Sequence, residues 1–145
     1  MRRFPVSIAT GAACFLAAAL ATTAIAQPAP SAPDWSRYAD VEEILAITAD
    51  EDAAVRETTI WLAVVDGRGY IRTGNTTWGD NVVRDQAIAI RVAGDEIPVQ
   101  VQFIEDDALR ERVVATFREK YGWSDAMIGI FRGSHPKIMQ LDPRP

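Results

Sequence analysis

Residues 58–74 read TTIWLAVVDGRGYIRTG, and this stretch decides the fold class. Its first part is rich in β-branched and aromatic residues, which favour strands. Asp66-Gly67-Arg68-Gly69 comes next, and Asp and Gly tolerate the positive φ angles that a tight hairpin turn needs. Tyr70 to Thr73 then supplies a partner strand. The stretch therefore predicts a β-hairpin made from residues 55–65 and 70–73.

Alternating apolar residues predict further strands downstream. Residues 87–92 and 97–103 each place a large apolar side chain at every second position. Pro98 lacks the N–H group that a strand ladder uses, so we expect its strand at a sheet edge or beside a bulge. Residues 137–141 form a last short strand. Between the hairpin and these strands, residues 74–80 read as a polar loop that leads into a short segment, 81–86.

Two helices are predicted. Residues 40–47 begin with acidic residues and place Val41, Ile44 and Leu45 at helical spacing, which indicates a short helix near the start of the domain. Residues 106–121 form a long helix, which begins with Asp106-Asp107 and ends before Gly122. Its buried stripe is expected to be Leu109, Val113, Phe117 and Tyr121. Together with the strands, this order indicates an α+β fold with a small antiparallel sheet or barrel.

The first 26 residues have the pattern of a cleaved signal peptide. Arg2 and Arg3 are followed by an Ala-rich apolar run, and Ala24-Ile25-Ala26 matches the small-x-small cleavage pattern. We therefore expect export to the periplasm or beyond the cell, with a Pro/Ala linker at residues 27–33 and one domain at 34–145. The export route, general secretory or twin-arginine, stays open.

Composition narrows the function classes. The chain has a net charge of −5, and cleavage would remove two of its basic residues, so nucleic acid and anionic membranes are not expected partners. Cys14, the only cysteine, lies in the predicted leader, which excludes disulfides and a thiolate nucleophile from the domain. With His135 as the only histidine, in a Gly-Ser-His-Pro turn, no metal site is predicted.

Several local motifs together resemble the FMN-binding split β-barrel superfamily. They are Thr59–Gly67, Tyr70–Gly74, Trp78, Arg84 and the helix end Thr116–Gly122. Within the superfamily, the chain is most similar to small bacterial relatives of deazaflavin-dependent nitroreductases and pyridoxamine-phosphate oxidases. The resemblance implies a small antiparallel split β-barrel, with one long C-terminal helix and one short N-terminal helix. Split barrels of this type usually pair, and we expect a homodimer.

The resemblance also implies where a cofactor would bind. In flavin-binding members, a basic residue and short hydroxyl residues at a strand-to-loop junction hold the cofactor phosphate. The matching cofactor-binding positions are Arg72, Thr73, Thr76, Thr77, Trp78 and Arg84. A guanidinium fork with short donors suits a doubly charged phosphate. FMN, a deazaflavin and no cofactor at all remain open, and no residue is assigned as catalytic by this comparison.

Two function classes follow. One is a flavin-type oxidoreductase that acts on a small aromatic or conjugated substrate, with the cofactor performing the hydride chemistry. The other is a cofactor-free exported protein that binds a small molecule, or catalyses an elimination or isomerisation with Arg72, Asp80 and His135 as candidates. Several of these residues also have an ordinary structural role open to them. Arg72 could be a surface charge on its strand, Arg84 could pair with Asp80 or Asp85, and Trp78 could cover the barrel mouth. Trp61 is expected in the core or at a dimer interface.

Overall fold

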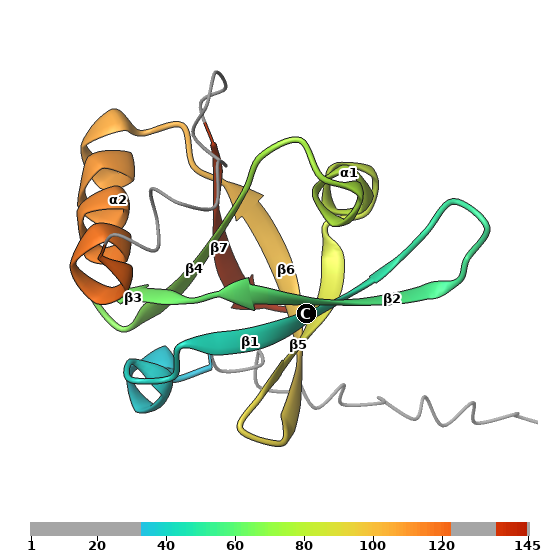
Figure 1. Ribbon diagram of the computed structural model, residues 1–145, viewed down its shortest axis with the longest axis horizontal. Helices are drawn as coiled ribbons and strands as arrows, with labels where there is room; N and C mark the ends of the chain where they lie inside the picture. Colours follow the sequence, from blue (N-terminus) through green and yellow to red (C-terminus); the bar gives the residue numbers. More distant parts are fainter. Residues whose placement is uncertain (1–32, 123–135, 145) are drawn as a thin grey trace, which may run out of the picture.

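One curled, seven-stranded antiparallel sheet forms the body of the protein (Figure 1). The computed structural model describes residues 33–122 and 136–144. The strand order is β2-β1-β5-β6-β7-β4-β3. The strands are β1 Glu43–Ala49, β2 Val55–Trp61, β3 Ala63–Val65, β4 Arg68–Thr73, β5 Ala87–Val92, β6 Asp95–Phe103 and β7 Lys137–Pro143. The helices are the short 3-10 helix η1 Trp35–Tyr38 and the α-helices α1 Thr77–Arg84 and α2 Asp107–Tyr121. The α+β class is confirmed, and the sheet is a curled half-barrel.

The predicted hairpin is confirmed as β3 and β4, joined by a turn in which Asp66 and Gly67 have φ angles of 51° and 75°. Positive φ at both central residues is the geometry that the Asp-Gly pair predicts. The predicted first strand is divided at Leu62 into β2 and β3. β2 pairs with β1, while β3 pairs with β4, so the division at Leu62 lets one run of sequence serve both ends of the sheet.

The predicted N-terminal helix at residues 40–47 is wrong, because most of that segment is strand β1. Ile44, Ala46 and Thr48 are buried while their neighbours are more exposed, which is the period-two pattern of a strand. The apolar positions also fit helical spacing, but pairing with β2 along the whole of β1 and with β5 at Leu45–Ile47 satisfies the backbone as a strand. The short helix that does precede the sheet is η1, which buries Trp35 and Tyr38.

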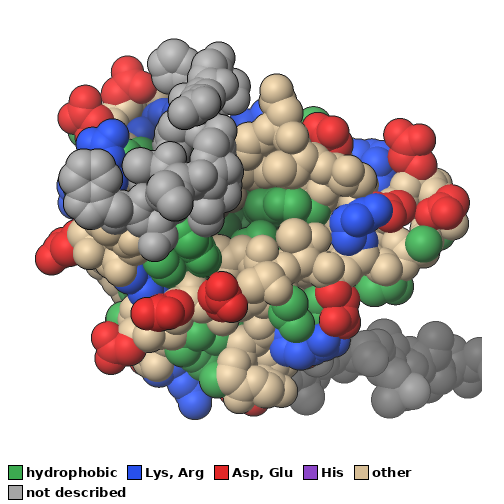
Figure 2. Space-filling model, viewed as in Figure 1, with side chains coloured by type: hydrophobic (Ala, Val, Ile, Leu, Met, Phe, Trp, Pro, Cys, Tyr) green, Lys and Arg blue, Asp and Glu red, His purple; other side chains and the backbone are tan. Residues whose placement is uncertain are grey.

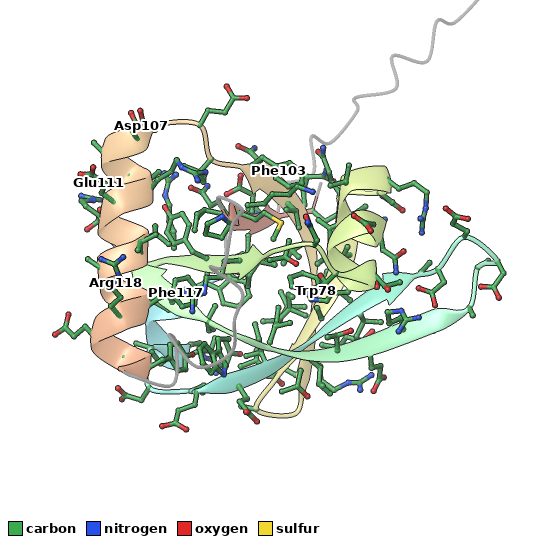
Figure 3. All side chains as sticks on the ribbon, turned by 45° about the horizontal axis from the view of Figure 1, so that its top comes forward. Trp78, Phe103, Asp107, Glu111, Phe117 and Arg118 are labelled. Atoms are coloured by element: carbon green, nitrogen blue, oxygen red, sulfur yellow. The ribbon has the colours of Figure 1, made fainter. Side chains whose placement is uncertain are left out.

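Helix α2 is confirmed with its cap at Gly122 and its buried stripe. Figure 3 shows Phe117 pointing from α2 toward the sheet, while Asp107 and Glu111 lie on the outer side of the helix. The long C-terminal helix that the resemblance implied is not confirmed, because α2 lies mid-chain and the predicted last strand follows it as β7. β7 lies between β6 and β4 and therefore joins the two parts of the sheet.

The edge position predicted for Pro98 is wrong, because β6 lies inside the sheet. Pro98 pairs with Ala89 of β5 on one side, but the pairing of β6 with β7 covers only residues 99–103. Pro98 therefore has a neighbouring strand on one side alone, which is the local condition that a missing N–H group requires.

Segment 77–84, expected as loop and short segment, is helix α1. The Thr76 hydroxyl accepts a hydrogen bond from the Gly79 N–H at 3.2 Å and so caps the helix. Trp78, Asn81 and Val82 form its buried face. Within the described ranges, no helix has the length and apolar character needed to cross a membrane.

Candidate functional site

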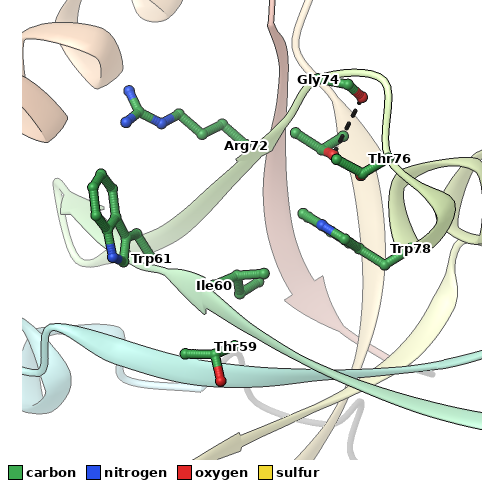
Figure 4. A pocket seen from close by; sticks show the side chains of 8 residues that line it. Thr59, Ile60, Trp61, Arg72, Gly74, Thr76 and Trp78 are labelled. Carbon is green, nitrogen blue, oxygen red and sulfur yellow. Dashed lines mark hydrogen bonds between the residues drawn. The ribbon is translucent and has the colours of Figure 1, made fainter. Parts of the chain in front are cut away.

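The inner cavity is a space of about 130 Å³ between β2, β4 and α1 (Figure 4). We use this name for the cavity lined by Thr59, Ile60, Trp61, Arg72, Thr73, Gly74, Thr76 and Trp78. β2 stands at one end of the strand order and β4 near the other, so the two are not paired with each other. The cavity therefore lies where the sheet curls round without closing. Figure 2 shows apolar side chains gathered in the middle of this face of the molecule.

Arg72 is the charged residue of the cavity wall, and it is only 5% exposed. Its guanidinium carbon lies 4.3 Å from the ring centre of Phe117 and 5.7 Å from that of Trp61. Such contacts are favourable cation–π interactions, and they are stronger where water is excluded. Burial, assisted by the positive charge of Arg118, lowers the pKa of Arg72 to about 10, while Tyr121 acts in the opposite direction. Arg72 is therefore still a cation near neutral pH.

Trp61 is fixed at the cavity by the end of α2. Its ring stacks on Tyr121, with centres 4.3 Å apart and planes 4° apart. The Tyr121 hydroxyl oxygen accepts a hydrogen bond from the Leu62 N–H at 3.1 Å and lies 2.9 Å from the Leu62 carbonyl oxygen. Lys120 Nζ donates to the same carbonyl at 2.9 Å. The backbone groups at the break between β2 and β3 thus find partners on α2, and Trp61 is held half-buried in the wall.

The turn after β4 is closed by its own hydroxyl groups. Thr73 Oγ1 and Thr76 Oγ1 are 2.6 Å apart, and Thr73 Oγ1 is also 3.3 Å from the Gly74 carbonyl oxygen. Gly79 lies so close that an added Cβ would be 2.6 Å from Thr73 Oγ1. A glycine is therefore required where α1 begins, and the two threonines are part of the packing of α1 against β4.

A second polar cluster, which we call the outer network, lies between α1 and the hairpin of β1 and β2. It consists of Asp50, Arg56, Asn81 and Arg84. Arg56 makes a bidentate pair with Asp50, with both nitrogen–oxygen distances at 2.7 Å. The side-chain amide of Asn81 donates to Asp50 at 2.7 Å, and Arg84 donates to Asn81 at 2.9 Å and to the Ala49 carbonyl. The network joins α1 to the hairpin of β1 and β2.

Four of the six residues predicted to bind a cofactor line the inner cavity, namely Arg72, Thr73, Thr76 and Trp78. Thr77 is exposed on α1 and does not line it. Arg84 belongs to the outer network, where it donates to the Ala49 carbonyl and to the Asn81 side chain in place of the expected aspartates. His135 lies outside the described residues. Asp80 is exposed in the first turn of α1.

Sequence reasoning placed Trp61 in the core or at a dimer interface and gave Phe117 to the helix stripe, without linking either to Arg72. The link depends on the Leu62 break and on the docking of α2, which connect positions 59 residues apart in the chain. The one local signal was the alternation in β4, which sets Arg72 on the same side as Tyr70 and opposite Ile71. Tyr70 and Phe117 indeed belong to one buried cluster and Ile71 to the other.

Comparison with known proteins identifies relatives in sequence and in fold. Residues 36–137 match the model of a family described as "Uncharacterized protein conserved in bacteria (DUF2255)". Among proteins with curated descriptions, the comparison gave no match.

Solved structures with a similar fold include three informative examples. A conserved hypothetical protein from Mycobacterium tuberculosis has a TM-score of 0.61 at 17% identity, with 86% of this chain and 87% of that chain covered. An F420-H2 dependent reductase has a TM-score of 0.57 at 13% identity, with 70% and 94% covered. The heme storage protein HutZ from Vibrio cholerae has a TM-score of 0.59 at 12% identity, with 78% and 89% covered. These structures confirm the resemblance at the level of the fold.

Proposed function

Because this chain belongs to the bacterial DUF2255 family and carries an aromatic cavity in the gap of a split β-barrel, we propose that it binds a planar, conjugated small molecule there. The finer proposal is a flavin-type oxidoreductase, in which a flavin or deazaflavin binds in the inner cavity and the substrate is a small aromatic or conjugated compound. The observation that carries it is the grouping of Trp61, Trp78 and the buried Arg72 around one space.

The ring of a flavin or deazaflavin fits the chemistry of this wall. Trp61 and Trp78 offer flat apolar surfaces, on which a conjugated ring stacks favourably. Arg72 places a positive charge at one side, where a ring carbonyl or a negative charge on the ring would be stabilised. Haem needs an axial ligand such as His, Cys, Met or Tyr, whereas the described lining supplies indole rings, hydroxyls and a guanidinium. The fold relatives include both a reductase and a heme storage protein, and this wall favours the first.

A bound flavin or deazaflavin would supply the hydride chemistry. The work of this chain would be to bind the ring between Trp61 and Trp78, to orient it with Arg72, and to exclude water from the side that faces the core. Two of the residues predicted to hold a phosphate, Arg84 and Thr77, lie away from the cavity, so the predicted phosphate site is not complete there.

The test uses the purified full chain. Its absorption spectrum is measured as isolated, and FMN, F420 and hemin are then titrated while the tryptophan emission is followed. Saturable quenching by FMN or F420, lost in Arg72→Met but kept in Arg84→Met, is the expected result. A colourless protein that responds to none of the three would reject the flavin proposal and favour the cofactor-free alternative. A response to hemin alone would move the protein to the haem-binding class.

Export and pairing belong to the same proposal. We propose that the leader is removed near Gln27, which mass spectrometry of protein from the native host would check; a periplasmic form that begins at Met1 would contradict it. We also propose a homodimer, since β2 is an end strand of the sheet that the described residues form. A monomer mass in light scattering would count against the dimer.

A further inference from the structure

The inner cavity and the turn beside it differ in the ligand groups that they can bind. We propose that the inner cavity is a subsite for one six-membered conjugated ring, and that its ligand is recognised without a phosphate group. This inference rests on the proposed function in placing the ligand in the cavity, and it adds the class of compound that the cavity selects. It departs from the phosphate site that the superfamily resemblance implied for this loop.

The size of the cavity sets the first condition. Its volume is about 130 Å³. An apolar cavity of roughly 150 Å³ holds one benzene ring, whereas sites that enclose a whole drug-sized ligand usually measure about 300–1,000 Å³. One ring therefore enters, and any further fused rings lie beyond it, at the exposed part of the lining that includes Thr59.

The walls set the second condition. Trp78 is only 7% exposed and belongs to the main core cluster together with Ile60, so both hold their places without a ligand. Trp61 is fixed by its stack on Tyr121. Figure 4 shows the Arg72 side chain extending from β4 away from Trp78, with its guanidinium above Trp61. The site thus offers two fixed indole rings and a cation at one end. A conjugated ring that carries an electron-rich oxygen is the ligand that fits it best.

The hydroxyl groups of the turn disfavour a phosphate as ligand. Thr73 and Thr76 have one hydroxyl proton each. If Thr73 donates to the Gly74 carbonyl, Thr76 donates to Thr73, and both protons are used within the turn. The oxygen of Thr76 also accepts from the Gly79 N–H. Turning either proton toward a phosphate would cost one of the hydrogen bonds within the turn.

Charge around the turn acts in the same direction. The first turn of α1 already contains an acidic residue, Asp80, whose carboxylate occupies the end of the helix that favours negative charge. Arg84, the other arginine expected to meet a phosphate, donates to the Ala49 carbonyl and to Asn81 in the outer network. A dianion at the turn would meet Asp80 without the help of Arg84.

The experiment compares five probes on the full chain, with the indole N–H signals of Trp61 and Trp78 followed by NMR. Phenol tests the single ring, and cyclohexanol is its matched non-conjugated control. Lumiflavin and FMN share a ring system, and only FMN has a phosphate. Inorganic phosphate tests the turn alone. Ile60→Phe fills the cavity, and Trp61→Leu is a second variant with a half-buried site, in case the first does not fold.

We expect phenol to bind about threefold to tenfold more tightly than cyclohexanol, as ring stacking predicts. Lumiflavin and FMN should have Kd values within about threefold of each other. Phosphate should leave the signals of Thr76 and Gly79 unchanged, and Ile60→Phe or Trp61→Leu should weaken the ring probes together. FMN binding more than about thirtyfold tighter than lumiflavin, or competition by phosphate, would overturn the inference.

Two outcomes separate this inference from the proposed function. If phenol binds in the cavity but neither flavin does, the flavin proposal fails and the single-ring subsite stands. If flavins bind and the fully folded Trp61→Leu variant retains their affinity, a flavin is bound elsewhere and the subsite is wrong. Failure of phenol, lumiflavin and FMN to bind would reject both the single-ring subsite and the flavin proposal.

Discussion

Arg72 and Arg84 lie twelve positions apart and were predicted to hold the same phosphate, yet the fold gives them opposite surroundings. Arg72 is buried against the rings of Phe117 and Trp61 in the inner cavity. Arg84 is exposed and donates within the outer network. The difference comes from the elements that carry them. Arg72 lies on a strand that faces α2 and contacts aromatic rings there. Arg84 lies on a short surface helix and contacts polar groups.

The two regions also use charge differently. The guanidinium of Arg72 in the inner cavity is buried, which costs hydration free energy. Charged groups with such perturbed surroundings cluster at functional sites. In the outer network each charge meets a partner in water-accessible surroundings, where an ion pair contributes little. The comparison supports our proposal that the first region binds a ligand, while the second attaches α1 to the hairpin of β1 and β2. Four predictions test that proposal.

The largest effect is expected at Arg72, and the same substitution at Arg84 is its matched control. Arg72→Met keeps the length and apolar character of the side chain and removes the charge. A hydrogen bond to a charged group contributes about 1.5–3 kcal/mol, so we expect lumiflavin affinity to fall by about tenfold to a hundredfold. Arg84→Met should leave affinity within about twofold, because Arg84 does not line the cavity. Equal losses in both variants, measured by fluorescence titration, would remove the distinction between the regions.

Gly79 lies between the two regions, and Gly79→Ala should be the next in size. An added Cβ would meet two atoms of Thr73, at 2.6 and 2.8 Å, and Thr76 Oγ1 at 2.9 Å. Overpacking costs about 1–3 kcal/mol, against a gain of up to about 1 kcal/mol in helix propensity, so we expect a net loss of about 1–2 kcal/mol. Denaturant unfolding measures it. Thr73→Ala in the same chain should recover part of the loss; purely additive losses would place the strain elsewhere.

Tyr121→Phe should cost about 1 kcal/mol near neutral pH, because the Leu62 N–H loses its acceptor while the ring stack on Trp61 remains. Burial raises the pKa of Tyr121 to about 12 in the folded protein. The unfolded chain therefore loses the proton first as the pH rises, and stability should decline between about pH 10 and 12. The variant should lack this contribution to the decline. An unchanged alkaline slope of the unfolding free energy would contradict the hydroxyl's place in the fold.

Asp50→Asn should have the smallest effect. Hydrogen bonds from Arg56 and Asn81 lower the pKa of Asp50 below its ordinary value of 3.8. The stabilisation is therefore complete above the unfolded pKa and is lost as the pH falls through the lower folded value. Wild type and variant should differ slightly near neutral pH and converge in acid, with ligand affinity unchanged throughout. A change in ring-probe affinity would show that the outer network also shapes the cavity.

The residues that could be interpreted from sequence are those whose role is local. The Asp66-Gly67 turn was predicted because positive φ is a property of the residues themselves. β1 was misread because its apolar residues fit both periods, and the choice between them is made by pairing with β2 and β5. Helix α1 was missed because Gly79 weakens its helix propensity, although Thr76 as a cap and Trp78 and Val82 four apart were the available signals. That Arg72 is buried follows only from the docking of α2.

The position of β7 has a consequence for how the molecule folds. Strands β2, β1, β5 and β6 form one part of the sheet and β4 and β3 another, and residues 137–143 pair with both. Until that segment is in place, the two walls of the inner cavity belong to separate sheets. Contacts between positions so far apart in the chain form slowly, because a long loop must close first. Ring-binding competence should therefore appear late in refolding, together with β7 protection from hydrogen exchange, and after the β3–β4 hairpin.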